Sequence, residues 1–241
     1  MQGDESATPK PIESGVFVTG TGTEVGKTVV AAAIAHTLAS EGLKVNVFKP
    51  AVTGLEEEGE TDHELLRRAA GSTQSDAEIA PYRYQPPVSP HLGAELAGEQ
   101  IDPERLLAAA RAAADDADEL VCEGVGGLLV PLAGRVTVDM RQEVDQRPYL
   151  VRNLAADLGL PIVIVASPGL GTINHTLLTI EAAWAAELEV AAVVLTPWPE
   201  EPNEVERSNR ETIAALAEVE VKTLPQLDLG DPDSWPALSW R

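Results

Sequence analysis

The fold of this chain is decided by residues 16–28, which read Val16-Phe17-Val18-Thr19-Gly20-Thr21-Gly22-Thr23-Glu24-Val25-Gly26-Lys27-Thr28. The apolar run at the start predicts a buried strand, and the alanine-rich stretch from Thr28 to Ser40 predicts a helix. Between them lies a loop rich in glycine and threonine. Its backbone N–H groups and the positive end of the helix would face an anion, so the segment is typical of a phosphate-binding loop, or P-loop.

The chemistry of such a loop comes from its last residues. The lysine reaches the terminal phosphates of a nucleoside triphosphate, and the hydroxyl group after it ligates Mg²⁺. Those roles fall to Lys27 and Thr28. Five residues separate Gly20 from Gly26, one more than the standard spacing. The alternative is a glycine-rich turn without a ligand, but the strand before it and the helix after it favour phosphate binding.

Along the rest of the chain, short apolar runs alternate with helical patterns. This alternation predicts one α/β domain with a P-loop NTPase-like fold, in which a mostly parallel sheet of about seven strands is flanked by helices on both faces. A proline-rich segment, 82–93, predicts an extended loop. The predicted strands are Val16–Val18, Lys44–Phe48, Glu119–Cys122, Leu128–Pro131 as a brief extension, Pro161–Ala166, Val190–Leu195 and Val221–Leu224.

The length of 241 residues suits a single large domain. Residues 1–13 are polar and predict a disordered arm, residues 14–227 form the predicted domain, and residues 228–241 form a tail without periodicity. No apolar run approaches the roughly 18 residues that a membrane-spanning helix requires. The single cysteine, Cys122, rules out an internal disulfide. A cytoplasmic location is the simplest expectation.

The charge balance is strongly acidic. The chain has 39 acidic and 17 basic residues, a net charge of −22, and only five of the basic residues are lysines. Such a field repels nucleic acid and anionic membranes, so neither is an expected partner. An acid-rich, lysine-poor surface is typical of halophilic proteins, because high salt screens the self-repulsion. Few lysines also make Lys27 and Lys49, both beside apolar strands, more informative.

Three further residues follow predicted strands or open a predicted helix. Because ligands gather at the carboxyl ends of parallel strands, Lys49 could neutralise a transferring phosphoryl group and Glu123 could hold Mg²⁺. The glycines after Glu123 let a ligand approach the backbone closely. Asp62, by local reasoning, is a helix N-cap residue. The alternatives are a surface lysine at a strand end and a solvent-facing carboxylate in a tight turn.

The segment Gly171-Thr172-Ile173-Asn174-His175 opens the helix after the apolar strand at 161–166. Its free N–H groups could bind a carboxylate. An ordinary glycine-started helix explains the same residues equally well.

Taken together and in this order, the motifs resemble those of the dethiobiotin synthetase family, ATP-dependent ligases of biotin biosynthesis. The P-loop shares that family's longer spacing. The other similar segments are Lys49-Pro50-Ala51-Val52-Thr53-Gly54, Asp62, Ser89-Pro90-His91, Glu123-Gly124-Val125-Gly126-Gly127 and residues 171–175.

The resemblance implies closure of a cyclic urea from 7,8-diaminononanoate and CO₂, through a carbamate that ATP phosphorylates. It implies that Lys49 and Lys27 are catalytic, and that the enzyme is a homodimer with small-molecule substrates. Thr28, Asp62 and Glu123 would hold Mg²⁺. Thr23, Thr53 and the segment Gly171, Thr172, Ile173 and Asn174 would contact the diamine substrate, the latter across the dimer interface. The implied nucleotide-binding residues are Glu24, Val25, Gly26, Lys27, Thr28, Val29, Asp62, Glu123, Gly124, Val125, Gly126, Thr196 and Pro225.

Two segments depart from the family pattern. The family usually has an asparagine that binds adenine where this chain has Thr196-Pro197, and proline removes a backbone donor, so base selectivity is in question. The stretch 135–149 is more charged than the pattern leads us to expect.

Two alternatives remain at this level. One is a related P-loop ligase that acts on another acid. The other is a partitioning-type ATPase switch, which carries an extra lysine early in the P-loop. Here that region reads Gly20-Thr21-Gly22, with no lysine before Lys27.

Overall fold

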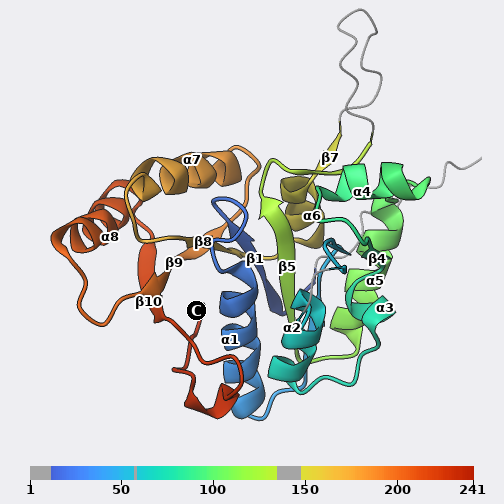
Figure 1. The fold of residues 1–241 in the computed structure, drawn as a ribbon, viewed down its shortest axis with the longest axis horizontal. Helices are drawn as coiled ribbons and strands as arrows, with labels where there is room; N and C mark the ends of the chain where they lie inside the picture. The colour runs from blue at the N-terminus through green and yellow to red at the C-terminus, as the bar shows by residue number, and fades with distance from the viewer. Residues whose placement is uncertain (1–11, 57–58, 135–147) are drawn as a thin grey trace, which may run out of the picture.

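The computed structural model describes residues 12–56, 59–134 and 148–241. Its main sheet has six parallel strands in the order β10-β9-β8-β1-β5-β2 (Figure 1). Their near-continuous apolar runs are buried between helices, as a helix-covered parallel sheet requires. The predicted α/β class is confirmed. The strands are β1 (Gly15–Gly20), β2 (Val45–Phe48), β5 (Glu119–Gly127), β8 (Ile162–Ala166), β9 (Val190–Trp198) and β10 (Glu220–Pro225).

Two short strand pairs lie outside this sheet. β3 (Ala51–Val52) pairs with β4 (Tyr82–Arg83), and β6 (Pro131–Ala133) pairs with β7 (Tyr149–Leu150). The chain turns away after β5, where Gly126 has a φ of 64° and the Val130 N–H donates to the Gly127 carbonyl. The segment predicted to extend the sheet at 128–131 therefore does not join it. The main sheet has six strands where we expected about seven.

Helices cover both faces of the sheet, and each face has its own buried apolar cluster. One face carries α1 (Lys27–Ser40), α2 (Asp62–Ala70) and the short α3 (Asp76–Ile79). The other carries α5 (Pro103–Asp115), α6 (Val151–Leu158), α7 (Thr172–Trp184) and α8 (Glu204–Ala217). None of the helices in the described residues is long and apolar enough to cross a bilayer.

The proline-rich segment corrects one expectation. Residues 82–93 were predicted to be an extended loop, but they contain β4 and the start of α4 (Pro90–Ala97). Ser89 is the N-cap residue and Pro90 occupies the first helical turn. Proline is tolerated there because that N–H has no partner within the helix. The proline thus marks the beginning of a helix.

The structure describes the predicted C-terminal tail, but little of the predicted N-terminal arm or of the charged stretch at 135–149. The tail contains a 3₁₀ turn at Pro232–Ser234 and buries Trp235 and Leu238 in the cluster formed with α1. Most of the predicted arm at 1–13 and of the charged stretch at 135–149 lies outside the described residues.

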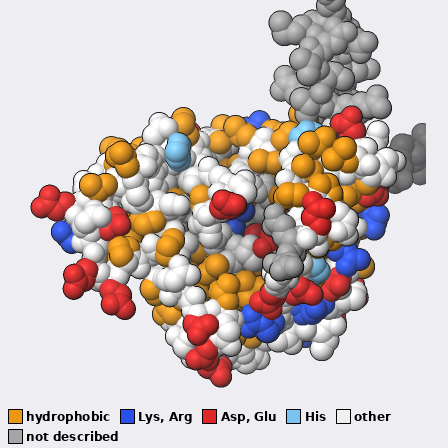
Figure 2. Space-filling model, in the orientation of Figure 1, with side chains coloured by type: hydrophobic (Ala, Val, Ile, Leu, Met, Phe, Trp, Pro, Cys, Tyr) orange, Lys and Arg blue, Asp and Glu red, His pale blue; other side chains and the backbone are white. Residues whose placement is uncertain are grey.

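The net charge of −22 leads to a prediction about salt. On the face drawn in Figure 2, acidic side chains stand at several separate places rather than in one patch. Because salt screens repulsion among such charges, the unfolding midpoint should rise by more than about 5 °C between 0.05 and ~3 M KCl. Thermal unfolding followed by circular dichroism checks this, with sucrose as a control for solute exclusion. A midpoint indifferent to KCl would contradict it.

Candidate active site at the carboxyl ends of the sheet

The P-loop lies where the strand order reverses. β1 pairs with β5 on one side and with β8 on the other, and ligands bind at such switch points. The Thr21 N–H donates to the Val165 carbonyl of β8 and anchors the loop. A Cβ on Gly20 would lie 2.7 Å from Val25 Cγ2, so the loop folds closely over the end of its own strand. Gly20 therefore allows the loop to pack closely at the candidate phosphate site.

Lys27 turns back over this loop. Its Nζ lies 2.8 Å from the Gly22 carbonyl oxygen, and the side chain is buried. Burial lowers the pKa of Lys27, and the nearby carboxylate of Glu123 opposes that change. An incoming phosphate can replace the carbonyl oxygen as the partner of this ammonium group.

Four other side chains converge beside the loop from four parts of the chain. Lys49 Nζ lies 2.6 Å from Glu123 Oε1 and 2.7 Å from Asp62 Oδ2. The Thr28 hydroxyl donates to the same Glu123 oxygen over 2.9 Å. Thr28 is the second residue of α1, Lys49 follows β2, Asp62 begins α2 and Glu123 lies in β5. We call Thr28, Lys49, Asp62 and Glu123 the charged cluster.

The three ionisable members of the charged cluster are the buried pair Lys49 and Glu123 and the half-exposed Asp62. Glu123 and Lys49 are 0% and 4% exposed. Burial alone would lower the pKa of Lys49, but Glu123 and Asp62 outweigh it and raise that pKa. Burial raises the pKa of Glu123, opposed by Lys49. Partial burial would raise the pKa of Asp62, but Lys49 and Thr28 outweigh it and lower that pKa. Such shifted, coupled groups in one place are typical of functional sites.

The chemistry of the charged cluster fits a hard divalent cation. Glu123 Oε2 is buried and has no hydrogen-bond partner within the described residues. The two carboxylates and the Thr28 hydroxyl offer oxygen ligands of the kind that Mg²⁺ prefers. No group of three or more His, Cys, Asp or Glu side chains able to hold a metal ion occurs in the described part of the chain. A site with two carboxylates suits Mg²⁺, which keeps several waters and shares its coordination with substrate phosphates.

Comparisons with known proteins identify the family. A family model described as an AAA domain matches residues 14–229. The ATP-dependent dethiobiotin synthetase of Rhodococcus erythropolis is 39% identical over 204 residues, 84% of each chain. The protein of the same name from Bacillus subtilis strain 168 is 33% identical over 208 residues, 86% of this chain and 84% of its own. The chain belongs to the dethiobiotin synthetase family. The resemblance inferred from the motifs is confirmed.

Solved structures agree with the fold of this dethiobiotin synthetase family member. The MinC:MinD cell division complex of Aquifex aeolicus gives a TM-score of 0.53 at 16% identity, covering 89% of this chain and 82% of that chain. A ParA family ATPase of Chlorobium tepidum gives 0.51 at 15% identity, covering 89% and 84%. At these identities the likeness concerns the fold alone.

Two of the predicted nucleotide-binding residues, Thr196 and Pro225, lie near the ends of β9 and β10. Thr196 is buried, and a Cβ on Gly26 would lie 2.8 Å from its methyl carbon. Thr196 therefore stands against the start of α1. Pro225 ends β10 in register with Trp198. The nucleotide-binding role of both residues stays a prediction.

Other predicted residues of the synthetase pattern surround the P-loop. Glu24 has a φ of 60°, a left-handed conformation that is unusual for a residue with a side chain. Thr23 Oγ1 would lie 3.9 Å from a Cβ on Gly126, so the loop approaches the end of β5. Val25, Val29 and Val125 are half-buried, and Gly124 packs near Phe17. Thr53 follows β3, where the next N–H, of Gly54, donates to the Pro86 carbonyl.

The segment Gly171–Asn174 is not tied to the charged cluster within this chain. Gly171 caps α7 with a φ of 92°, and the Thr172 and Thr176 hydroxyls lie 3.4 Å apart within the helix. Its predicted contact with the substrate carboxylate across a dimer interface stays a prediction.

Sequence reasoning passed over two features that shape the site. Thr19, at the end of β1, has a fully buried hydroxyl group without a hydrogen-bond partner in the described residues. Its place in the P-loop motif was the available signal. Asp76 binds Arg67 of α2 and Arg83 of β4, and so ties down the helix that begins with Asp62. Nothing in the local pattern indicates that network, because its members come from three elements.

Proposed function

We propose that this chain is an ATP-dependent dethiobiotin synthetase, which closes the ureido ring of dethiobiotin from 7,8-diaminononanoate, CO₂ and ATP in the cytoplasm. Family membership supports the reaction class. The observation that carries the mechanism is the buried Lys49, held 2.6 Å from Glu123 and 2.7 Å from Asp62 beside the P-loop. One buried carboxylate and one half-exposed carboxylate that hold a cationic side chain next to a phosphate-binding loop suit phosphoryl transfer.

The reaction needs alignment and positive charge more than covalent help from the protein. One amine of the diamine adds to CO₂ and loses a proton, which gives a carbamate. A carbamate oxygen attacks the γ-phosphorus of ATP, and ADP leaves. The second amine attacks the carbonyl carbon of the mixed anhydride and expels phosphate, with loss of a proton. Lys27 and Lys49 stabilise the charge on the γ-phosphoryl group and the carbamate.

Thr28, Asp62 and Glu123 are the residues that would hold Mg²⁺ in this proposal. The bound ion would neutralise phosphate charge and orient the β- and γ-phosphates. The chain's own contribution is the geometry. Glu123 orients both Thr28 and Lys49 through one oxygen, because each donates to Oε1.

The proposal is tested by phosphate release from ATP with Mg²⁺ and bicarbonate, with and without 7,8-diaminononanoate, in high salt. Diamine-dependent release together with dethiobiotin detected by mass is the expected result. Phosphate release at the same rate with and without the diamine would still support a nucleotide site, but it would overturn the assigned substrate.

The proposal includes a homodimer in which the partner supplies the start of α7 to the substrate carboxylate. The exposed apolar side chains there support an interface, since Leu170 is 95% exposed and Leu178 is 60% exposed. In an isologous dimer, each active site would combine Lys49 of one protomer with Asn174 of the other.

Mixing two inactive variants tests this arrangement. Lys49→Ala and Asn174→Asp chains, exchanged together, would form heterodimers with one intact site each. About a quarter of the parent activity should return, because half of the dimers are mixed and each has one working site of two. Mixtures that stay as inactive as their components would contradict the shared site. Size-exclusion chromatography with light scattering gives the oligomeric state of each variant.

Base selectivity is a separate prediction about Thr196. A threonine hydroxyl donates and accepts through a single atom, whereas an asparagine amide presents a separate donor and acceptor that can pair with an adenine edge at the same time. We expect Thr196→Asn to lower KM for ATP about three- to tenfold relative to GTP, about 1 kcal/mol of hydrogen bonding. KM ratios for ATP and GTP measure the effect. A Thr196→Val chain, similar in shape but without a hydroxyl group, is the control. Equal ratios in all three chains would exclude Thr196 from base recognition.

A further inference from the structure

The C-terminal residues 226–241, called the strap below, enclose the helix that follows the P-loop. Six consecutive residues of α1, Val30–Ala35, are buried. A helix covered on one side shows a buried stripe, whereas a run buried all round requires neighbours on every side. The sheet forms one wall of α1 and α2 packs on another. The strap forms a further wall, since Trp235 and Leu238 belong to the same buried cluster as Ile34.

Specific bonds hold the strap to α1. The Leu238 N–H donates over 2.9 Å to the buried hydroxyl group of Thr37. The Trp235 ring meets the His36 ring edge-on, with centroids 5.5 Å apart. The Trp235 indole N–H donates 2.7 Å to the Asp228 carbonyl, which closes the strap on itself. Figure 1 shows the strap, in red, crossing beside the lower half of α1.

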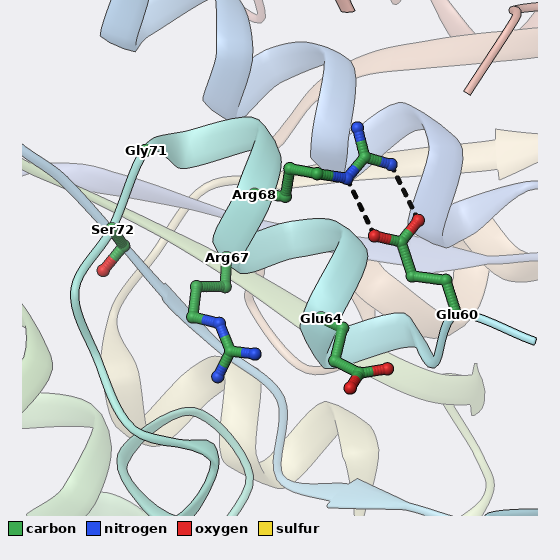
Figure 3. A pocket seen from close by; sticks show the side chains of 6 residues that line it. All are labelled: Glu60, Glu64, Arg67, Arg68, Gly71 and Ser72. Atoms are coloured by element: carbon green, nitrogen blue, oxygen red, sulfur yellow. Dashed lines mark hydrogen bonds and ion pairs between the residues drawn. The ribbon is translucent and has the colours of Figure 1, made fainter. Parts of the chain in front are cut away.

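Both ends of the strap also contact other elements that carry site residues, namely α2 and β5. Near its start, the Leu229 carbonyl accepts a hydrogen bond from Arg68 of α2 over 2.9 Å. Arg68 is itself held by two bonds to Glu60 (Figure 3). At its end, Arg241 lies 2.6 Å from Glu119 at the beginning of β5. The hollow drawn in Figure 3 lies on α2 and is lined by Glu60, Glu64, Arg67, Arg68, Gly71 and Ser72.

The strap therefore contacts α1, α2 and β5, the three elements that carry Thr28, Asp62 and Glu123. We propose that the strap is a positioning segment, which sets these elements so that their three oxygen ligands meet at one Mg²⁺ site. This inference rests on the proposed function for the identity of the cation. Thr37 lies about 13 Å along α1 from Thr28, so a tilt of α1 at Thr37 moves Thr28 relative to Glu123. Most of the strap lies beyond residue 229, where the family match ends.

The experiment measures how Mg²⁺ concentration controls ATP binding, by calorimetry, and needs no diamine or turnover. A chain ending at Gly230 should need about tenfold more Mg²⁺ for half-maximal ATP binding than the parent, since small misplacements of ligands carry large costs. Adding a peptide of residues 231–241 should return the value toward that of the parent. Ala237→Ser, a change at an exposed strap residue, should leave it unchanged.

A second variant keeps the test decisive if the shortened chain fails to fold. Thr37→Val combined with Arg241→Ala removes one bond at α1 and one at β5, and should raise the Mg²⁺ requirement severalfold in a chain that circular dichroism shows to be folded. A lower unfolding midpoint with an unchanged Mg²⁺ requirement would make the strap merely structural and overturn the proposal. A parent chain without Mg²⁺-dependent ATP binding would instead refute the metal site of the proposed function.

Discussion

Lys49→Ala should lower turnover by about a hundred- to a thousandfold, the cost of deleting a preorganised group that stabilises transition-state charge. The Lys49 ammonium is the group that bridges Glu123 and Asp62 beside the P-loop. Its pKa is raised, so it carries the positive charge that a phosphorylated carbamate requires. Single-turnover phosphate release with the diamine and bicarbonate measures the loss. Near-normal release in this variant would refute the catalytic role.

Lys49→Ala should also lower the stability of the fold, because it leaves Glu123 as a fully buried carboxylate without its ion-pair partner. Removing one partner of a buried pair costs about 3 kcal/mol, some of which Glu123 avoids by taking up a proton. The double variant Lys49→Met/Glu123→Gln has no unpaired buried charge at this position. It should therefore be more stable than Lys49→Ala but equally inactive. Urea unfolding separates the two effects.

Glu123→Gln should lower turnover by about a hundredfold and raise the Mg²⁺ concentration needed for half-maximal rate. Glutamine keeps the size of the side chain but offers a weaker, neutral ligand. It also places an amide where Glu123 Oε1 now accepts from both Thr28 and Lys49. The initial rate as a function of Mg²⁺ at saturating ATP is the measurement.

The exposed pair of Lys44 and Asp116 supplies matched controls for both variants. Its charged atoms lie 2.8 Å apart, but the side chains are 59% and 76% exposed. Lys44→Ala and Asp116→Asn remove the same kinds of charge, and solvent-exposed pairs contribute little. Both should keep parental rates and Mg²⁺ dependence. If Glu123→Gln and Asp116→Asn showed the same Mg²⁺ dependence of the rate, Glu123 would not be a metal ligand.

Local pattern was enough to predict most of the fold. The alternation of apolar runs with helical periodicity placed the six strands of the main sheet and α2 at Asp62–Ala70. Apolar strands flanked by polar loops carry a strong signal because burial imposes it residue by residue. The wrong prediction of an extended loop through Pro90 also has a local cause, because proline disrupts the interior of a helix but is favoured in its first turn.

Part of the candidate site could also be predicted from local sequence, and part could not. The P-loop was readable because Gly20 to Thr28 form one contiguous motif that joins a strand to a helix. By local reasoning, Lys49 and Glu123 were expected because strand ends collect ligands, and Asp62 was expected to be a helix N-cap residue. That cap is Thr61 instead, and only the family resemblance placed Asp62 with Glu123. That Lys49 bridges both carboxylates follows from the strand order, which places β5 between β1 and β2.

The P-loop motif, the parallel α/β class and the synthetase family could be inferred without a structure, because contiguous residues or their order along the chain carry each signal. The burial of Lys49 between two carboxylates and the packing of residues 226–241 on α1 appeared only in the folded chain. The strap has no periodicity, since it packs through Trp235, Leu238 and Arg241 on partners distant in sequence. Contacts of that kind depend on which surfaces the folded elements leave uncovered.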